Sequence, residues 1–408
     1  MGSKVLVVDD DISHLKLVEA ILLGAGYTVQ TLGDSSQAME KMASFMPDIF
    51  IVDLMMPQTD GFALIRDVRA NKEYDFIKIL VLSAKAFSYD QGRAYELGAN
   101  AYVTKPIDAA KFREQVKAIL RNEIKVTFWG TRGTVPTPYK DFLEYGGNTS
   151  CVSVEFSEGR LFIFDAGTGI IRLGDYLLGQ KKRTKINLLV SHPHWDHIHG
   201  LPFFKPAFIQ GNEIAIYGTA HGDLSMREVM SGQMESIYFP ITIREYAARL
   251  YFKELWEGEY LIEGIRLQTI LLNHPGNTLG YKLSCANGKS VAYITDNELV
   301  PENLGPRDPH FRGKLVQFLK DVDLLIHDSS YFDDEYESRI GWGHPPLSEL
   351  LQLVKEANVK NLYMFHHDPG HNDEKVAEKE RFAKAFIKEH NLDIQCFAAR
   401  EGVTVTLK

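Results

Sequence analysis

Residues 191–197 read Ser-His-Pro-His-Trp-Asp-His and directly follow the apolar run INLLV at residues 186–190. A strand that ends in this loop would present imidazole nitrogens and a carboxylate at its carboxyl end. These donor atoms suit zinc, iron or manganese rather than calcium. The alternative, a histidine-rich surface loop, is disfavoured because further histidines and an aspartate follow strands later in the chain. The stretch therefore predicts a metal site with a catalytic role.

The overall composition is that of an ordinary globular protein with room for two or three domains. The chain has 408 residues, of which 45% are hydrophobic and 24% charged. Its net charge of -9 argues against a basic surface that holds nucleic acid. Three widely spaced cysteines favour a reducing compartment. Because no signal peptide and no membrane-spanning stretch is visible, we expect a cytoplasmic protein without a membrane partner.

The first part of the chain, to about residue 120, alternates short apolar strands with amphipathic helices. We expect strands at residues 5–8, 48–52, 79–82 and 101–103, and helices at residues 13–23, 35–44, 62–71 and 109–120. The strands are continuously apolar, as buried parallel strands are. A repeat of this kind predicts an α/β fold with a doubly wound (βα)5 sheet, whose functional loops lie at the strands' carboxyl ends.

Carboxylates gather at those carboxyl ends. Asp9 and Asp10 follow the first strand, and Asp53 follows the third. Because neighbouring carboxylates repel each other unless a cation joins them, these oxygens predict a magnesium site. Ser83 ends the fourth strand and Lys105 follows the fifth. A hydroxyl and an ammonium group there could hold the oxygens of a phosphoryl group on the middle aspartate.

These motifs resemble the receiver domain of two-component response regulators. The matching elements are VVDDD at residues 7–11, DLMMP at residues 53–57, Ser83-Ala84, Tyr102 and Lys105-Pro106. The resemblance covers residues 3–121, and we assign residues 1–122 to this domain. A receiver that keeps the fold without the chemistry is disfavoured because every key polar position is filled.

The resemblance implies a function for each matched residue. Asp53 would accept the phosphoryl group, and Asp9, Asp10, Asp53 and the Met55 carbonyl would bind magnesium. Ser83 and Tyr102 would form the switch pair, and Lys105 would contact the phosphate. The resemblance also implies a cognate sensor histidine kinase as partner and signalling through the face of the fourth and fifth helices. We therefore expect a homodimer.

A second domain, assigned to residues 123–408, begins without a flexible linker. Its expected strands lie at residues 125–129, 151–156, 161–165, 214–217, 265–272, 281–284 and 290–295. Outside the opening motif, His274, Asp296 and His366 each follow an apolar run. Together with the motif they offer enough ligands for two metals about 3.5–4 Å apart, with one aspartate able to bridge them.

The HxHxDH motif, followed in order by His, Asp and His, resembles the metallo-β-lactamase superfamily over residues 124–408. That resemblance implies an αββα sandwich that binds two divalent transition metals, zinc or manganese or iron. It implies that His192, His194 and His274 bind one metal. It further implies that Asp196, His197 and His366 bind the other, that Asp296 bridges the two, and that Asp196 belongs to the catalytic set.

Four further motifs resemble the ribonuclease Z and phosphodiesterase branch of that superfamily. They are FWGTRG at residues 128–133, YGGNTS at 145–150, HDSSY at 327–331 and GHPP at 343–346. The resemblance puts Asp328 and His344 beside the metals. We expect His344 to donate a proton to the leaving oxygen and Asp328 to orient it. We prefer His366 to His367 as the ligand because it comes first after its strand.

Departures from that branch narrow the expected substrate. No basic, Gly/Pro-rich arm lies between His197 and His274, and Asp328 replaces the usual glutamate, so precursor tRNA is a poor candidate. We therefore expect a phosphodiesterase under control of Asp53, acting on a nucleotide-type small molecule, a cyclic nucleotide or cyclic dinucleotide. The alternatives are hydrolysis of a lactone, a thioester, another small phosphodiester or RNA, and a domain that binds a messenger or partner without cleaving it.

Two details of the second domain stay open at this point. The aromatic residues between residues 201 and 256 are expected mostly in the core, with a few beside the metals. His327 is expected to be buried and hydrogen-bonded, whereas the sequence offers no partner for His221 or His310.

Overall fold

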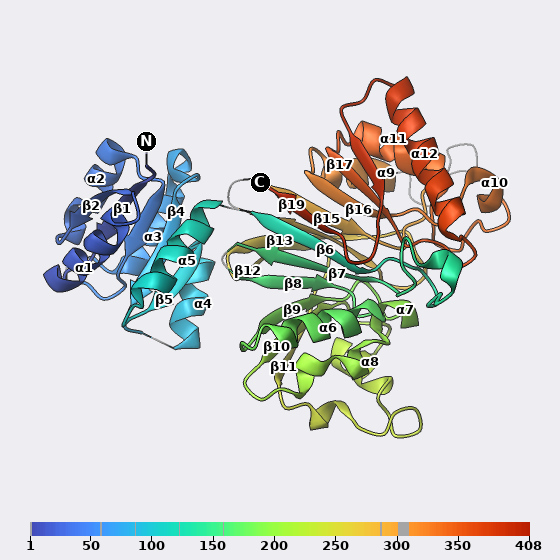
Figure 1. The fold of residues 1–408 in the computed structure, drawn as a ribbon, viewed down its shortest axis with the longest axis horizontal. Helices are drawn as coiled ribbons and strands as arrows, with labels where there is room; N and C mark the ends of the chain where they lie inside the picture. The colour runs from blue at the N-terminus through green and yellow to red at the C-terminus, as the bar shows by residue number, and fades with distance from the viewer. Residues whose placement is uncertain are drawn as a thin grey trace.

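The computed structural model of the chain describes residues 2–408 except residues 58, 86, 122, 158, 286–287 and 301–309. An N-terminal domain leads through its last helix, α5 (Ala109–Arg121), into the first strand of the second domain, β6 (Ile124–Gly130) (Figure 1). Residue 122 lies outside the described residues, so the boundary at residues 122/123 stays a prediction. Within the described part of the chain, no helix is long and apolar enough to cross a membrane.

The N-terminal domain is a parallel sheet, in the order β2-β1-β3-β4-β5, between two layers of helices. Its strands are β1 (Lys4–Val8), β2 (Thr28–Leu32), β3 (Ile49–Val52), β4 (Lys78–Ser83) and β5 (Ala101–Thr104), and its helices are α1 (Ile12–Leu23), α2 (Ala38–Phe45), α3 (Gly61–Ala70), α4 (Ser88–Glu96) and α5. Val5 and Val7 pack toward α1 and α5, whereas Leu6 and Val8 pack toward α2 and α3. The predicted doubly wound fold is confirmed.

The structure differs from the sequence reading of this domain at three places. Helix α4 is not among the expected helices. The helix expected at residues 35–44 is a 3₁₀ turn, Ser35–Gln37, followed by α2. The edge strand β2 carried no continuous apolar signal, because its residues are only half-buried.

The second domain is a sandwich of two sheets between two helical layers (Figure 1). The first sheet contains β11 (Arg249–Glu254), β10 (Glu213–Gly218), β9 (Lys185–Leu189), β8 (Leu161–Phe164), β7 (Cys151–Phe156), β6 and β19 (Thr404–Leu407), in that order. The second contains β12 (Gly258–Ile262), β13 (Ile265–Leu271), β14 (Leu279–Ser284), β15 (Ser290–Ile294), β16 (Leu324–Asp328), β17 (Asn361–Phe365) and β18 (Gln395–Ala398).

Alternation along the strands builds the layers. In β8, Phe162 and Phe164 face the core between the two sheets, whereas Leu161 and Ile163 face the helices. Phe164 stacks on Tyr293 of the opposite sheet, with ring centroids 4.8 Å apart. The outer helices are α6 (Gly169–Gly179), α7 (Trp195–Ile198) and α8 (Met226–Gly232) near the first sheet, and α9 (Phe311–Leu319), α10 (Asp333–Tyr336), α11 (Leu347–Glu356) and α12 (Asp373–Glu389) near the second. The predicted αββα sandwich is confirmed.

The two domains touch at the tip of the β12–β13 hairpin. This hairpin turns at Glu263 and Gly264, whose positive φ values of 51° and 75° suit a two-residue turn. A Cβ added to Gly264 would lie 2.8 Å from the Ala99 carbonyl oxygen of the receiver-like domain, and Tyr95 of α4 lies nearby. The turn therefore rests against the loop between α4 and β5.

Candidate functional site

The residues of the HxHxDH motif and its expected partners lie where strands of both sheets end. The motif follows β9, and His274 follows β13. Asp296 and His366 follow β15 and β17. Because these ends meet at one edge of the sandwich, side chains far apart in sequence form one cluster. Asp296 belongs to two groups of possible ligands that these residues form, and to a third with Asp328, His344 and His366.

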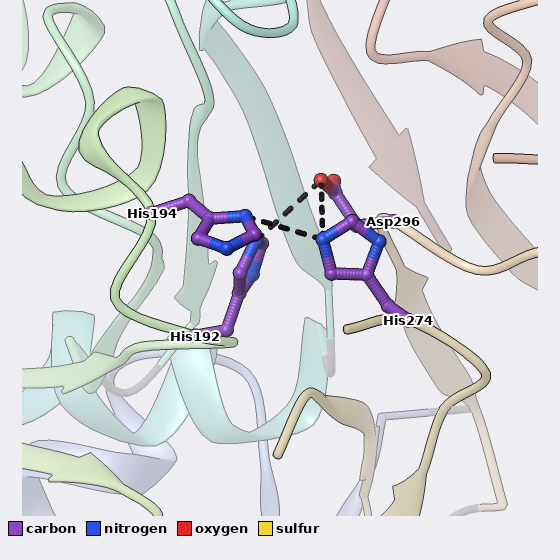
Figure 2. Close-up of side chains that lie close together, drawn as sticks. All are labelled: His192, His194, His274 and Asp296. Carbon is purple, nitrogen blue, oxygen red and sulfur yellow. Dashed lines mark hydrogen bonds and ion pairs between the residues drawn. The ribbon is translucent and has the colours of Figure 1, made fainter. Parts of the chain in front are cut away.

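The first group contains His192, His194, His274 and Asp296 (Figure 2). The Nδ1 atom of His194 lies 2.9 Å from His192 Nε2 and 3.2 Å from His274 Nε2. Asp296 Oδ2 lies 3.5 Å from His192 Nε2 and 3.6 Å from His274 Nε2. Three imidazole nitrogens and a carboxylate oxygen thus point at one position.

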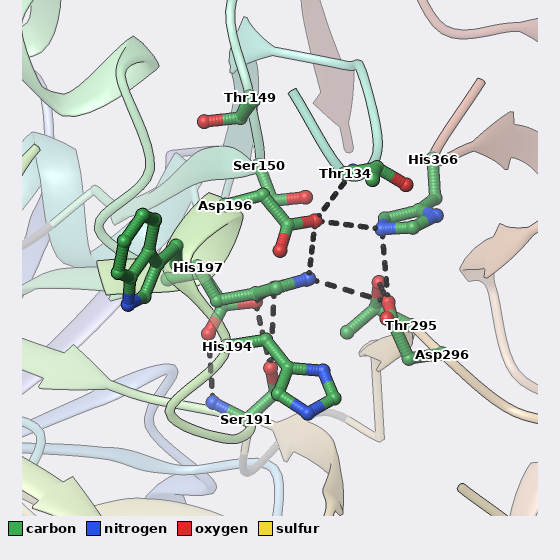
Figure 3. A network of polar contacts seen from close by, with 12 residues as sticks. Thr134, Thr149, Ser150, Ser191, His194, Asp196, His197, Thr295, Asp296 and His366 are labelled. Carbon is green, nitrogen blue, oxygen red and sulfur yellow. Dashed lines mark hydrogen bonds and ion pairs between the residues drawn. The ribbon is translucent and has the colours of Figure 1, made fainter. Parts of the chain in front are cut away.

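The second group contains Asp196, His197, His366 and again Asp296 (Figure 3). Asp196 Oδ2 lies 3.1 Å from both His197 Nε2 and His366 Nε2. Asp296 Oδ1 lies 3.3 Å from His197 Nε2 and 3.1 Å from His366 Nε2. Asp296 therefore presents one oxygen to each group, as a bridging ligand would.

The chemistry of this cluster fits divalent metals. Imidazole nitrogens and carboxylate oxygens are the donors that zinc, manganese and iron take in proteins. His197 Nε2 is fully buried, and its contacts with Asp196 and Asp296, at 3.1 Å and 3.3 Å, do not have the geometry of hydrogen bonds. Asp196 and Asp296 are 6% and 2% exposed, and buried like charges need a cation nearby. These residues can hold two metal ions.

The ionisation of the cluster differs between the two groups. Burial alone would raise the pKa of the Asp296 carboxyl, but His366, His197 and His192 hold it well below its ordinary value. Burial holds the pKa of His192 well below its ordinary value. Burial would also lower the pKa of His197, but the carboxylates of Asp196, Asp296 and Asp165 raise it well above its ordinary value. Because metal binds neutral imidazole, a metal at the second group would displace a proton from His197.

Each buried histidine of the cluster is oriented through its other ring nitrogen. The Nδ1 atoms of His192 and His366 lie 3.1 Å and 3.3 Å from the hydroxyls of Ser191 and Ser330. The Nδ1 atom of His274 lies 3.1 Å from the carbonyl oxygen of Gly343. A Cβ at Gly343 would collide with the His274 ring, so this close approach requires glycine.

Asp165 orients His197, and sequence reasoning missed it. Its Oδ2 atom lies 2.7 Å from His197 Nδ1 and accepts a hydrogen bond from the Tyr293 hydroxyl, also at 2.7 Å. Ser191 donates to the same carboxylate from its amide and its hydroxyl. The available signal was an aspartate directly after the apolar run LFIF, the same pattern that identified Asp296.

Replacing Asp165 with asparagine should weaken metal binding by about 10–100-fold, the usual cost of losing a residue that orients a ligand. An asparagine side chain has one acceptor oxygen, so it cannot accept the hydrogen bond from His197 Nδ1 and also those that Ser191 and Tyr293 now donate to the carboxylate. Metal content after dialysis against graded chelator measures the effect. Tyr293→Phe, which removes one bond to the carboxylate but keeps its charge, should have the smaller effect. Unchanged affinity in Asp165→Asn would contradict this role.

The FWGTRG and YGGNTS motifs form the frame on one side of the cluster. The fully buried Arg132 donates to the carbonyl oxygens of Gly146 and His371, at 2.7 Å and 2.6 Å. The Thr134 amide donates to Asp196 Oδ2 at 2.7 Å. The frame therefore fixes a carboxylate of the second group.

Strained backbone surrounds the cluster. Thr134, Asp165, Asp296 and His366 have φ values of 64°, 59°, 45° and 56°. Such values cost about 1 kcal/mol or more for residues other than glycine and persist where the surrounding structure enforces them. Sharp turns directly after the strands thus aim these side chains.

Asp328 and His344 lie beside both groups. His344 Nδ1 is 2.7 Å from Asp328 Oδ2, and Ser330 donates to Asp328 Oδ1 from its amide and hydroxyl. The His344 ring lies 5.1 Å from that of His366 and 5.4 Å from that of His274. Asp328 and His344 also come within ligand distance of Asp296 and His366. Their bond to each other favours an acid–base role.

Replacing Asp328 with asparagine should move the alkaline limb of the pH–rate profile to lower pH. Burial would lower the pKa of His344, but the Asp328 carboxylate raises it to about 9. A proton donor is active below its pKa and is lost as the pH rises through it. Without the charge, burial dominates and the donor is lost earlier. The profile of kcat/KM against pH tests this. Ser330→Ala, which removes a hydrogen bond to Asp328 but keeps the carboxylate charge, is the comparison variant. An alkaline limb at the same pH in wild type and Asp328→Asn would contradict the prediction.

The other histidines do not join the cluster. His367 Nε2 lies 3.0 Å from the Ala399 carbonyl oxygen, and His371 Nε2 lies 2.9 Å from Glu335. His327 is buried with Nδ1 2.8 Å from the Asp328 carbonyl oxygen. His221, for which the sequence suggested no role, lines a cavity beside the cluster.

In the N-terminal domain the expected residues also converge. Asp9, Asp10 and Asp53 bring carboxylate oxygens within ligand distance of one another. Lys105 Nζ lies 2.7 Å from both Asp9 Oδ2 and Asp53 Oδ2. Burial would lower the pKa of Lys105, but these two carboxylates raise it.

The remaining receiver-like positions surround that aspartate cluster. The Met55 amide donates to Asp53 Oδ1, and the role of its carbonyl stays a prediction. Ser83 is buried at the end of β4. The Tyr102 hydroxyl donates to the Lys85 carbonyl oxygen at 2.8 Å.

Comparison with known proteins identifies both domains. Residues 5–117 match the response regulator receiver domain, and residues 160–367, half of the chain, match the beta-lactamase superfamily domain. The chain is 38% identical over 121 residues to the alkaline phosphatase synthesis transcriptional regulatory protein PhoP of Bacillus subtilis, which is 30% of this chain and 50% of that protein. It thus spans about half the length of the receiver-containing relatives that it matches.

Two further matches cover the second domain. Ribonuclease Z of Halalkalibacterium halodurans is 26% identical over 313 residues, which is 64% of this chain and 94% of that protein. The crystal structure of the metallo-beta-lactamase fold protein YhfI from Bacillus subtilis, 17% identical, covers 70% of this chain and 100% of that one with a TM-score of 0.52, and shows the fold. The chain therefore belongs to the beta-lactamase superfamily and carries a response regulator receiver domain ahead of its metallo-β-lactamase fold.

Proposed function

We propose that the second domain is a hydrolase of phosphodiesters with a two-metal centre. His192, His194 and His274 would hold one ion, Asp196, His197 and His366 the other, and Asp296 both. The observation that carries this proposal is the position of Asp296, whose two oxygens face the two groups separately. When bound, zinc, manganese or iron ions would polarise the phosphoryl oxygens and lower the pKa of an attacking water.

The proton for the leaving oxygen would come from His344. Its ring packs against His274 of the first group and His366 of the second, so it lies over the position that a shared substrate would occupy. Asp328 holds the ring by Nδ1, which leaves Nε2 for the substrate. Asp196 would act as a ligand that the Thr134 amide keeps in place.

A nucleotide-type messenger is the proposed substrate, with cyclic nucleotides and cyclic dinucleotides as the leading candidates. A receiver joined to a phosphodiesterase would link a phosphorylation signal to the level of such a messenger. RNA is the competing substrate because the chain is similar to a ribonuclease Z over most of that protein's length. The net charge of -9 favours the small molecule.

Metal analysis combined with a substrate panel tests this proposal. The full-length protein is loaded with zinc or manganese and given cyclic mononucleotides, cyclic dinucleotides, a lactone, a thioester and RNA. We expect hydrolysis of phosphodiesters by wild type and its loss in His194→Ala. Rapid turnover of the lactone or thioester with inert phosphodiesters would overturn it, and so would stoichiometric metal without any turnover.

We further propose that phosphorylation of Asp53 by a sensor histidine kinase, with magnesium at Asp9, Asp10 and Asp53, controls this activity. The contact at the tip of the β12–β13 hairpin supports a route by which a change at Asp53 could reach the cluster. Tyr102 bonds to the Lys85 carbonyl at the start of the α4 region. The loop after α4 contacts Gly264, and β13 connects the hairpin turn at Gly264 to the loop that carries His274.

A phosphoryl mimic on Asp53 should therefore change turnover at least several-fold, and Asp53→Ala should abolish that response. Gly264→Ala should weaken the response because its Cβ would press on the Ala99 carbonyl. Gly288→Ala is the matched control, since Gly288 has a φ of 85° and open space around it. Steady-state rates with and without beryllofluoride measure the effect. Equal rates in wild type under both conditions would contradict the control by Asp53.

A further inference from the structure

A cavity of about 880 Å³ adjoins the metal cluster. Its lining includes Pro193 and Trp195, which alternate with the histidines of the HxHxDH motif. Thr134, whose amide holds Asp196, also lines it, as do Val229 of α8 and Phe239. A substrate that reaches both the metals and this cavity would place its phosphodiester at the cluster and another part of itself in the cavity.

The walls suit a flat, neutral group. Aromatic rings line the cavity, and Phe203 meets Phe239 edge to face with centroids 5.3 Å apart. Trp195 and Tyr238, both in the lining, are 79% and 73% exposed, and large exposed apolar side chains that gather at one place mark a binding surface. Among the described residues that line the cavity, none is lysine or arginine, so a phosphate would gain little there.

Two polar side chains of the lining each have an unpaired nitrogen. Gln233 Nε2 and His221 Nδ1 are closed off from solvent and form no hydrogen bond within the part of the chain that the structure describes, so turning either nitrogen toward a ligand would break no hydrogen bond of its own. A buried donor left unpaired costs about 1–3 kcal/mol, which a ligand with a matching acceptor would recover. An alkyl chain would leave both atoms unpaired. A heteroaromatic ring has the flat faces for the walls and the polar edge for these two groups.

We infer that this cavity binds the nucleobase of a nucleotide phosphodiester, with Trp195 and Phe203 against its faces and Gln233 and His221 at its edge. The inference rests on the proposed phosphodiesterase activity and specifies its substrate class. An extended RNA strand would need cationic side chains along its phosphates, which the lining does not offer.

The test compares phosphodiesters that share one leaving group. Metal-loaded full-length protein is given p-nitrophenyl thymidine 5′-phosphate, methyl p-nitrophenyl phosphate and octyl p-nitrophenyl phosphate. We expect kcat/KM for the thymidine ester to exceed that for the methyl ester by about tenfold or more, the equivalent of one buried hydrogen bond with stacking. Gln233→Leu should reduce this ratio several-fold, mainly through KM, whereas Gln268→Leu on the exposed face of β13 should leave it unchanged.

A second readout needs no activity. Thymidine 5′-monophosphate added to metal-free protein should quench tryptophan fluorescence, and Trp195→Leu should remove this quench while Trp256→Leu keeps it. Equal kcat/KM for all three esters, unaffected by Gln233→Leu, would overturn the inference and leave the phosphodiesterase standing. A preference for the octyl ester alone would identify a site for apolar chains and also overturn it. If no ester is cleaved, the phosphodiesterase proposal fails, and the fluorescence experiment still decides whether the cavity binds a base.

Discussion

Asp296→Ala should lose both metals and about 10³-fold or more of the turnover. Among the described residues, Asp296 is the side chain shared by the two groups built on the HxHxDH motif. Its Oδ2 atom faces His192 and His274, and its Oδ1 atom faces His197 and His366. Metal stabilisation of a phosphoryl transition state amounts to several kcal/mol, and each 1.36 kcal/mol is tenfold in rate. Metal content by elemental analysis and kcat on a phosphodiester measure the two losses together.

Thermal unfolding separates loss of metal from loss of fold. Metals that bind only the folded protein should raise the Tm of wild type, and they should raise that of Asp296→Ala far less. Asp321→Ala is a matched control, because Asp321 also has a positive φ, of 56°, and lies outside the cluster. If Asp296→Ala kept two metals and activity within tenfold of wild type, the two groups would not share this aspartate.

The cluster could be predicted because each of its residues has a local sequence signal. His274, Asp296 and His366 each follow an apolar strand, and strand ends in such sheets meet at one edge. The N-terminal fold followed from the pattern of buried strands, whereas the αββα sandwich followed from the resemblance that the HxHxDH motif carries. The strands that were missed, such as β2 and β11, lie at sheet edges and consist of exposed and half-buried residues, so burial leaves little trace in their sequence.

The parts of the site that could not be predicted depend on tertiary contacts. Asp165 becomes important only because His197 points at it from the neighbouring strand end. The Gly343 carbonyl that orients His274 is backbone, so no side chain signals it. Gln233 and His221 become candidate ligand contacts only because the fold places them in the lining of the cavity. Sequence reasoning therefore reached the residues of the cluster, but not the groups that orient them or the residues that line the cavity beside them.

The second large effect concerns His344. On a phosphodiester with an alkoxide leaving group, His344→Ala should lower kcat by about 10²–10⁴-fold, the usual contribution of a positioned general acid. On a p-nitrophenyl ester the same variant should lose far less, because p-nitrophenolate leaves readily without a proton. His344 lies within ligand distance of Asp296 and His366, but Asp328 holds its Nδ1 atom and it belongs to neither group built on the HxHxDH motif. If His344 is the proton donor, metal content should therefore stay at the wild-type level.

The comparison of leaving groups decides between two roles for His344. A residue that donates the proton affects only substrates whose leaving oxygen needs it. A residue that binds metal or supports the His366 ring would affect both substrates alike and would lower metal content as well. His390→Ala, at the end of α12 against Phe386, is the control for loss of an imidazole elsewhere. Equal losses on both esters would therefore assign His344 to the metal centre, with Asp328 as the residue that orients a ligand.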